Sequence, residues 1–476
     1  MRYFFSLAAV ISLALSVFSC QPAEDDPVSG DVKTPVLVSS DPADGADGIV
    51  GDAIDLKMVF DMNVMCPTAQ RERITVDNGA AVDGIEAYMT EVTVSLSGLE
   101  SGQTYTVIFP EGTITGYSEN PASEIRITFS TAEEMTPEDQ EISENPVTED
   151  AIPAAERLYD YLRSIYGKQT LSGAMANVAW NTDEAEWVGR FTGKYPAIAF
   201  FDYIHLASSP ANWIDYGDIS PVRDWWNAGG LVGASWHWNV PRTSADKDPL
   251  QFTCDAGIDF SAADAVVAGT WENDFVNASL EKIAAYLKLL QDEGIPVLWR
   301  PLHEAAGNWY TQWQSGAWFW WGADGAQAYK DLWIYVFDYF KEAGLRNLIW
   351  VWTTQTSSAS DADFDFYPGD SYVDIIGKDI YNTDDVRALS SQFSTVIQYS
   401  SHKMVTLSEL GGVADMTSQW NAGAHWLYFM PWYDYDLGEA GYTSENHSQA
   451  DISWWEASFA SDAVITRDEL PAELHQ

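Results

Sequence analysis

From Ala154 onward, short apolar runs alternate with longer amphipathic stretches, and this alternation constrains the fold more than any other feature. Eight of the runs have the length and composition of buried strands: Thr170–Met175, Ala197–Tyr203, Leu231–Trp238, Pro296–Glu304, Asn347–Thr353, Val373–Tyr381, Met404–Leu410 and Ala424–Trp432. Helical spacing is clearest over residues 275–293, and Gly294 ends that helix. Eight strands with intervening helices predict one (β/α)8 barrel. A doubly wound sheet is the alternative, but its usual glycine-rich phosphate loop is missing.

Residues 35–131 have a different texture, with apolar and polar residues alternating as in short strands. This pattern predicts an all-β sandwich of about 100 residues. From its opening Asp41–Gly45 (DPADG) to its closing Phe129–Thr131 (FST), the run resembles bacterial Ig-like domains. It contains no catalytic constellation, so we expect a spacer. Residues 132–152 are acidic and contain Pro137 and Pro146, which is typical of a linker. The predicted catalytic domain then covers residues 153–476.

The first 20 residues predict a targeting segment, because Arg2 precedes a short apolar stretch that ends at Ser19-Cys20. Residues 17–20 (VFSC) resemble a bacterial lipoprotein signal, in which Cys20 is lipidated and becomes the mature N-terminus. The acidic residues 24–26 resemble signals that send lipoproteins to the surface of some Gram-negative bacteria. We therefore expect a lipid anchor at the cell surface or outer membrane, with simple secretion as the alternative.

The charge and the cysteines restrict partners and cofactors. Lys and Arg number 24 against 71 Asp and Glu, for a net charge of −47, which disfavours nucleic acid and anionic lipid surfaces. Contact with a membrane is expected only through the lipid. Besides Cys20, only Cys66 and Cys254 are present, so neither a disulfide framework nor a CxxC metal site is expected. We expect a monomer without a metal or cofactor.

In a (β/α)8 barrel, functional side chains lie at the carboxyl ends of the strands. That rule selects six residues by position alone: Asp202, His237, Glu304, Tyr381, Glu409 and Trp432. The two glutamates follow the fourth and seventh predicted strands. Glycoside hydrolysis requires such a pair of carboxylates, one protonated and one ionised. Either glutamate alone could equally form a salt bridge or cap a helix, and Asp202 could simply cap the following turn.

The surroundings of Glu304 favour a sugar-binding cleft. The segment Trp299–Gly307 (WRPLHEAAG) is followed by Trp309 and by the aromatic run Trp318–Gly322 (WFWWG). Apolar rings near a glutamate raise its pKa toward that of a working general acid. A zinc-protease HExxH motif is excluded, because position 307 holds glycine instead of histidine.

These motifs resemble glycoside hydrolase family 26, whose members are mostly β-mannanases. The acid/base signature of the family is Arg300–Glu304 (RPLHE) with the Trp-rich turn, and Ser408–Gly411 (SELG) resembles its nucleophile motif. Further matches are Ser235–Trp238 (SWHW), residues 373–381, Pro431-Trp432 and Val464–Thr466. The resemblance covers roughly residues 154–476.

The resemblance implies a role for each matching residue. Glu304 would be the acid/base and Glu409 the nucleophile of a retaining hydrolase. His237 and His303 would contact hydroxyl groups of the sugar beside the cleaved bond, Tyr381 would hydrogen-bond the nucleophile, and Trp432 would form a stacking floor. About ten residues separate Gly307 from Trp318, so either Trp309 or Trp318 could be the tryptophan of the motif.

The implied activity is endo-hydrolysis of β-1,4-mannosidic bonds in mannan, galactomannan or glucomannan, without a cofactor because two carboxylates carry both steps. Within the family, a β-1,3-1,4-glucanase, a β-1,3-xylanase or a mannobiose-releasing exo-mannanase are the alternatives. Residues 305–318 could block one end of the cleft and favour exo action. A non-catalytic surface glycan-binding lipoprotein is the alternative of another class, and the presence of both glutamates disfavours it.

Overall fold

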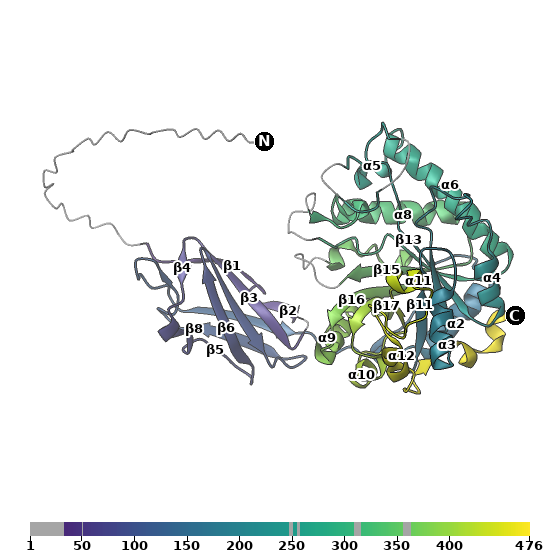
Figure 1. Ribbon diagram of the computed structural model, residues 1–476. Coiled ribbons are helices and arrows are strands. Elements are labelled where there is room, and N and C mark those ends of the chain that lie inside the picture. The colour runs from purple at the N-terminus through teal and green to yellow at the C-terminus, as the bar shows by residue number, and fades with distance from the viewer. Residues whose placement is uncertain (1–32, 50, 247–250, 255–257, 309–315, 356–362) are drawn as a thin grey trace, which may run out of the picture. The chain divides into compact units, whose positions relative to one another are not determined.

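The structure is a computed structural model that describes residues 33–49, 51–246, 251–254, 258–308, 316–355 and 363–476 (Figure 1). These residues form two compact units. Residues up to 45, 55–97 and 105–129 make the first, and residues 46–54, 98–104 and 130–476 make the second.

The N-terminal region is a β-sandwich, as the alternation predicts. One four-stranded sheet has the order β1 (Leu37–Asp41), β3 (Ala53–Phe60), β7 (Glu91–Ser97) and β6 (Ala81–Tyr88). The other has the order β2 (Ala46–Ile49), β10 (Ile125–Thr131), β8 (Thr104–Phe109) and β5 (Thr75–Val76). A small ribbon of β4 (Val64–Met65) and β9 (Thr115–Gly116) and the short helix α1 (Thr68–Arg71) complete it. The alternating apolar residues of β3 and β7 are buried, because each strand turns one face to the core.

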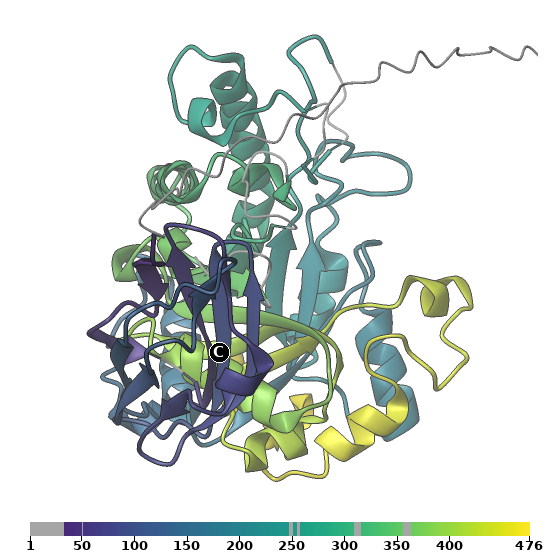
Figure 2. The same ribbon diagram turned by 90° about the vertical axis from the view of Figure 1, so that its left-hand side faces the viewer.

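The predicted (β/α)8 barrel is confirmed in the second unit (Figures 1 and 2). Its parallel strands are β11 (Thr170–Met175), β12 (Ile198–Asp202), β13 (Leu231–Trp236), β14 (Val297–Pro301), β15 (Leu348–Gln355), β16 (Ile375–Thr383), β17 (Met404–Val413) and β18 (Tyr428–Pro431). Each strand pairs with the next, and β11 pairs with both β12 and β18, which closes the barrel. A short strand, β19 (Val464–Ile465), pairs with β11 from outside this ring.

Helices surround the strands in both views (Figures 1 and 2). They are α2 (Pro153–Ile165), α3 (Asp183–Thr192), α4 (Ser220–Asn227), α5 (Ala262–Ala265), α6 (Trp271–Asp292), α8 (Ala326–Glu342), α9 (Val386–Ile397), α10 (Met416–Asn421), α11 (Tyr435–Glu439) and α12 (Ile452–Ser458). In α6 the Thr270 side chain accepts the N–H of Asn273, an N-cap that fixes where the helix begins. None of the helices in the described ranges is long and apolar enough to cross a membrane.

The end of β14 differs from the expected strand and positions the site. The sequence predicts a strand through Glu304, whereas β14 ends at Pro301. Leu302 and Glu304 have φ angles of 50° and 54°, in the left-handed region that breaks an extended strand. Glu304 therefore lies in a turn just beyond the strand, and its side chain does not follow the alternating directions of the strand residues.

Most tryptophans serve the core. Trp187, Trp236, Trp238, Trp299, Trp320, Trp321, Trp333, Trp352, Trp426 and Trp455 are among the largest fully buried side chains. Trp213 is the exception within residues 213–238, at 63% exposed. Aromatic abundance therefore reflects packing more than an extended sugar-binding surface.

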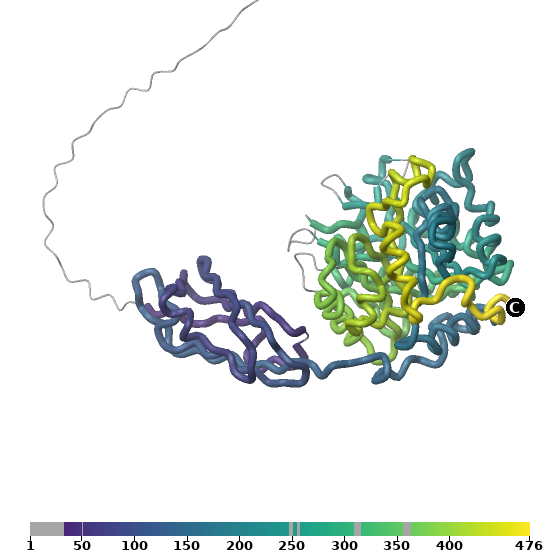
Figure 3. Tube along the Cα trace, turned by 60° about the horizontal axis from the view of Figure 1, so that its bottom comes forward, coloured from purple at the N-terminus to yellow at the C-terminus, as the bar shows by residue number. Residues whose placement is uncertain are grey.

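The acidic segment 132–152 is bonded to the barrel along part of its length. Gln140 donates from Nε2 to the carbonyls of Ser400 (2.7 Å) and Lys403 (3.0 Å). At the other end of the chain, Arg157 of α2 donates to the main-chain oxygen of Gln476, and the C-terminus lies near α2 (Figures 1 and 3). Both contacts lie away from the carboxyl ends of the strands.

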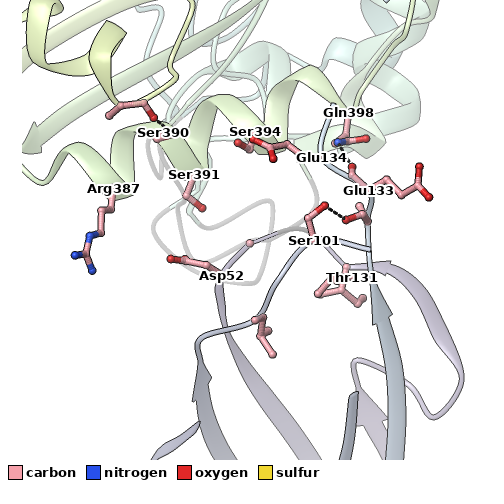
Figure 4. Close-up of a pocket in the computed structure, with 15 residues that line it drawn as sticks. Asp52, Ser101, Thr131, Glu133, Glu134, Arg387, Ser390, Ser391, Ser394 and Gln398 are labelled. Atoms are coloured by element: carbon pink, nitrogen blue, oxygen red, sulfur yellow. Dashed lines mark hydrogen bonds between the residues drawn. The ribbon is translucent and has the colours of Figure 1, made fainter. Parts of the chain in front are cut away.

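Figure 4 shows a pocket lined by residues of the second unit. Ser391 of α9 and Gln398 directly after that helix line it together with residues such as Asp52 and Glu133. Gln398 donates from Nε2 to the Glu133 carbonyl over 3.1 Å. None of the residues that the sequence singles out lines this pocket, so the catalytic site must be sought elsewhere.

Candidate active site

Glu304 is held at the barrel mouth by main-chain hydrogen bonds. Its N–H donates to the carbonyl of Thr353 on β15 over 3.0 Å, and its own carbonyl accepts the N–H of Gly307 over 2.9 Å. The side chain is only 9% exposed. The turn after β14 thus fixes a buried carboxyl group directly above the neighbouring strand.

Glu409 reaches the same place from β17. The register between β16 and β17 shifts after Lys378, so that Asp379 is opposite Glu409 and Ser408 is skipped. This irregularity turns the Glu409 side chain toward the barrel axis. The Tyr381 hydroxyl donates to Glu409 Oε1 over 2.5 Å, the contact that the sequence predicts.

A third carboxylate, which the sequence analysis missed, belongs to the same cluster. One carboxylate oxygen from each of Glu304, Asp379 and Glu409 lies within 4.8 Å of the others. Asp379 precedes Tyr381 by two residues, so both side chains emerge on the same face of β16. That spacing could have indicated Asp379 once Tyr381 was assigned to the site.

Arg300 supplies the positive charge of the cluster. It is fully buried at the end of β14, and its guanidinium bonds to the carboxylate of Asp379. The same Nη2 lies 3.0 Å from Glu409 Oε2, and Nε donates to Thr353 Oγ1 over 3.1 Å. The sequence identifies Arg300 only as part of a motif, whereas the structure gives it two carboxylate partners.

The environment of Glu304 favours its protonated form. Burial raises the pKa of Glu304 well above its ordinary value, and the charges of Asp379 and Glu409 raise it further, while Arg300 opposes them. Burial also raises the pKa of Asp379, to about 7. Glu409 is held by its ion pair with Arg300 and by the hydrogen bond from Tyr381.

Two histidines line the site next to the carboxylates. The Nδ1 atom of His237 lies 2.5 Å from Asp202 Oδ2, and the His237 N–H donates to Asp202 Oδ1 over 3.1 Å. Asp202 thus orients a histidine on the next strand, an outcome that sequence reasoning left open. The His303 ring lies 4.5 Å from that of His237. Burial, followed by the charge of Arg300, lowers the pKa of His303 well below its ordinary value, which keeps the ring neutral.

Two of the three predicted tryptophans, Trp432 and Trp318, lie within the described residues. Trp432 is half-buried, and its ring lies 5.6 Å from His237. Trp318 packs so closely on Gly307 that a Cβ atom there would lie 2.3 Å from the indole ring, so position 307 requires glycine. Trp318 therefore lies beside the Glu304 turn. Trp309 and the proposed lipid site Cys20 lie outside the described residues.

The three carboxylates are also the only group of His, Cys, Asp and Glu within the described ranges that could share a cation. Arg300 already places its guanidinium on two of them, so the negative charge has a counter-charge from the protein itself. The roles assigned to the individual site residues stay predictions.

Family models match two parts of the chain. Residues 147–469 match the model described as glycosyl hydrolase family 26, and residues 31–131 match a bacterial Ig-like domain. Among curated proteins, a mannan endo-1,4-beta-mannosidase of Thermothelomyces thermophilus is 34% identical over 327 residues, 67% of this chain and 61% of the relative. This chain spans 61%, 53% and 50% of the first three curated relatives that it matches.

Solved structures agree with these matches. The family 26 domain of an endo-beta-mannanase/endo-beta-glucanase from Prevotella bryantii is 43% identical, with a TM-score of 0.62 over 69% of this chain and 99% of that one. A beta-mannanase from a symbiotic protist of the termite Reticulitermes speratus, complexed with gluco-manno-oligosaccharide, is 33% identical. Its TM-score is 0.58 over 69% of this chain and 98% of that one.

Proposed function

This chain belongs to glycosyl hydrolase family 26, and we propose that it is a retaining endo-β-1,4-mannanase acting on mannan, galactomannan or glucomannan. One observation carries the reaction type. Oxygens of Glu304 and Glu409 lie within 4.8 Å of each other, and burial raises the pKa of Glu304 well above its ordinary value. Retaining enzymes place their carboxyl groups roughly 5–5.5 Å apart and inverting ones roughly 6.5–9.5 Å apart. The close approach of the two carboxyl groups supports double displacement.

The proposed mechanism has two steps. In the first, Glu409 attacks the anomeric carbon while Glu304 donates its proton to the departing glycosidic oxygen, which gives a glycosyl ester on Glu409. In the second, ionised Glu304 takes a proton from water, whose oxygen attacks the anomeric carbon and releases Glu409. Both carboxyl groups end in their starting states, so no cofactor is consumed.

The proposed substrate rests on the relatives. The first three curated relatives are named mannan endo-1,4-beta-mannosidases, and one structural relative is complexed with gluco-manno-oligosaccharide. His237, fixed by Asp202, and neutral His303 present ring nitrogens where a sugar hydroxyl could bind. Mannose and glucose differ only in the direction of the C2 hydroxyl, so donors and acceptors near that group would decide between them.

A parallel assay tests the sugar and the mode of action. Purified full-length protein is incubated with mannan, galactomannan, glucomannan, barley β-glucan and β-1,3-xylan, and viscosity and products are followed from the first minutes. We expect an early fall in viscosity and mixed oligosaccharides from the mannans only. Mannobiose as the sole early product would mean exo action, and cleavage confined to barley glucan or xylan would replace the substrate assignment. Binding without any reducing sugar would establish a glycan-binding protein.

After burial, the charge on Asp379 is the largest cause of the raised pKa of Glu304 and should contribute to the alkaline side of the pH profile. Because that charge raises the pKa of Glu304, Asp379→Asn removes the effect, and Glu304 should lose its proton at lower pH. The acid form is the active one, so the alkaline limb of kcat/KM should move to lower pH. Profiles of both proteins at fixed ionic strength test this. An unchanged limb, or one at higher pH, would contradict the proposed acid.

We further propose that lipid on Cys20 anchors the protein at the outer membrane or surface of a Gram-negative cell. The support is the signal-like segment before Cys20 and the acidic residues after it. Expression of the full chain with Cys20→Ser in such a host should release activity from the membrane fraction. Equal membrane association of both proteins would overturn the anchor.

A further inference from the structure

A buried polar cluster joins the first turn of α3, the segment after Trp432 and the loop between α11 and α12. We propose that Glu184 and His447 are positioning residues, which hold Trp432 and the end of the nucleophile strand in the geometry that the reaction needs. This inference rests on the proposed function. Glu184 lies on the first turn of α3 and His447 on the loop between α11 and α12. Their side chains are 4% and 2% exposed, so water does not supply their partners.

Glu184 uses both carboxylate oxygens as acceptors. Oε1 accepts the N–H of Asp434 over 3.1 Å, and Oε2 lies 3.1 Å from His447 Nε2. Asp434 follows Trp432 by two residues and caps α11, since its side chain accepts the N–H of Leu437. A single carboxylate on α3 therefore anchors the segment that carries the proposed stacking floor.

The contacts of His447 fix its tautomer. Its Nδ1 accepts the N–H groups of Gln449 (3.0 Å) and Ala450 (3.1 Å), so it carries no proton. The ring proton is then on Nε2 and is donated to Glu184. The imidazole also stacks on Trp187, at 5.2 Å between ring centres and 27° between planes. The ring therefore contacts Glu184, Trp187 and the main chain of residues 449 and 450, and it links α3 to the segment 447–450.

That segment packs against the end of β17, close to Glu409. The Gln449 carbonyl accepts the N–H of Gly412 over 2.9 Å. At Gly411, an added Cβ atom would lie 1.8 Å from Gln449 Oε1 and 2.6 Å from the Tyr381 ring. The segment 447–450 is therefore in direct contact with the strand end that carries Glu409, and only glycine leaves room for it.

Glutamine at position 184 cannot replace the carboxylate. In either orientation of the introduced side-chain amide, its NH2 group faces another donor, either the Asp434 N–H or the His447 Nε2–H. The mismatch should displace Trp432 slightly. Trp432 would contact the sugar whose glycosidic bond is cleaved. We therefore expect a larger effect on kcat than on KM, because KM also depends on the binding of sugars further from the cleaved bond.

The test compares Glu184→Gln with a matched control, Asp374→Asn. Asp374 is also buried and also accepts two main-chain N–H groups, from Val147 (2.7 Å) and Trp350 (2.8 Å), but it precedes β16 at the opposite end of the barrel. With mannohexaose as substrate, we expect kcat of the Glu184 variant to fall ~10-fold or more, with KM within about twofold. The control should lose thermal stability and keep kcat.

Two substitutions at position 447 separate the loss of this pairing from general damage. In His447→Gln, the amide nitrogen can donate to Glu184 and the amide oxygen can accept the N–H groups of Gln449 and Ala450, so most of kcat should remain. His447→Leu offers neither contact and should lose kcat as Glu184→Gln does. Equal kcat for Glu184→Gln and wild type, equal losses in the control, or equal losses in the two His447 variants would each overturn the inference. Failure of the proposed function is distinct, because the wild-type protein itself would then leave mannohexaose intact.

Discussion

Glu409→Ala is expected to abolish the release of reducing sugar from mannan, and Glu304→Ala to reduce it by ~10²–10⁴-fold. Besides Glu304, Asp379 is the only other carboxylate of this cluster within the described residues. Asp379 is bonded to Arg300, and one of its oxygens accepts the Ser408 hydroxyl over 2.7 Å. Loss of Glu304 removes only the proton donor, so its effect depends on how much help the departing oxygen needs.

The leaving group distinguishes these two roles. With a mannobioside of an acidic phenol, which departs without protonation, Glu304→Ala should still form the glycosyl ester and show a burst of phenol. Glu409→Ala should show none. Circular dichroism and thermal melting of each variant confirm that the fold persists. Substantial mannan hydrolysis by either folded variant would refute the two-carboxylate assignment.

Arg300→Met should have the second-largest effect, on stability and activity together. It would leave Asp379 and Glu409 as buried carboxylates without a counter-charge. Breaking a buried ion pair by removing one partner costs about 3–5 kcal/mol. Glu409 would also lose one of the two groups that hold its carboxylate, so kcat should fall as well. Denaturant unfolding and kcat measured on the same samples test both effects.

Lys378→Met provides a matched control. Lys378 is also buried and its Nζ lies 3.0 Å from Asp363, but it neighbours Asp379 on β16 and so points to the opposite face. Its loss should lower the free energy of unfolding and leave kcat nearly unchanged. The double variant Arg300→Met/Asp379→Asn should regain part of the free energy of unfolding, because it has one fewer buried carboxylate without a counter-charge. Activity retained by Arg300→Met would show that Glu409 does not need the guanidinium.

The predicted architecture is correct where burial is uniform along an element. Each barrel strand is buried on both faces and is therefore recognisable as a continuous apolar run, and α6 has its apolar stripe facing the core. The prediction is least accurate at strand ends, as at β14. A left-handed turn at Leu302 and Glu304 depends on bonds to β15, which no local pattern contains.

Aromatic content illustrates the same limit. The number of tryptophans suggests a sugar-binding surface, but most of them are buried in the core. Trp432 differs from the core tryptophans only in its position: it is half-buried and lies beside His237. The same indole side chain can pack in a core or bind a sugar, and its position in the fold determines which of the two it does.

The sequence by itself determined the barrel, the sandwich and the two glutamates, because each is marked by local periodicity or by a motif at a strand end. Tertiary structure alone decided which further groups surround them. Asp379 and Arg300 meet Glu409 through the pairing of strands far apart in the chain, and the shift of register after Lys378 sets their spacing. The raised pKa of Glu304 follows from burial and from the carboxylates that this pairing brings next to it, since the free energy of a charge depends on its neighbours in space.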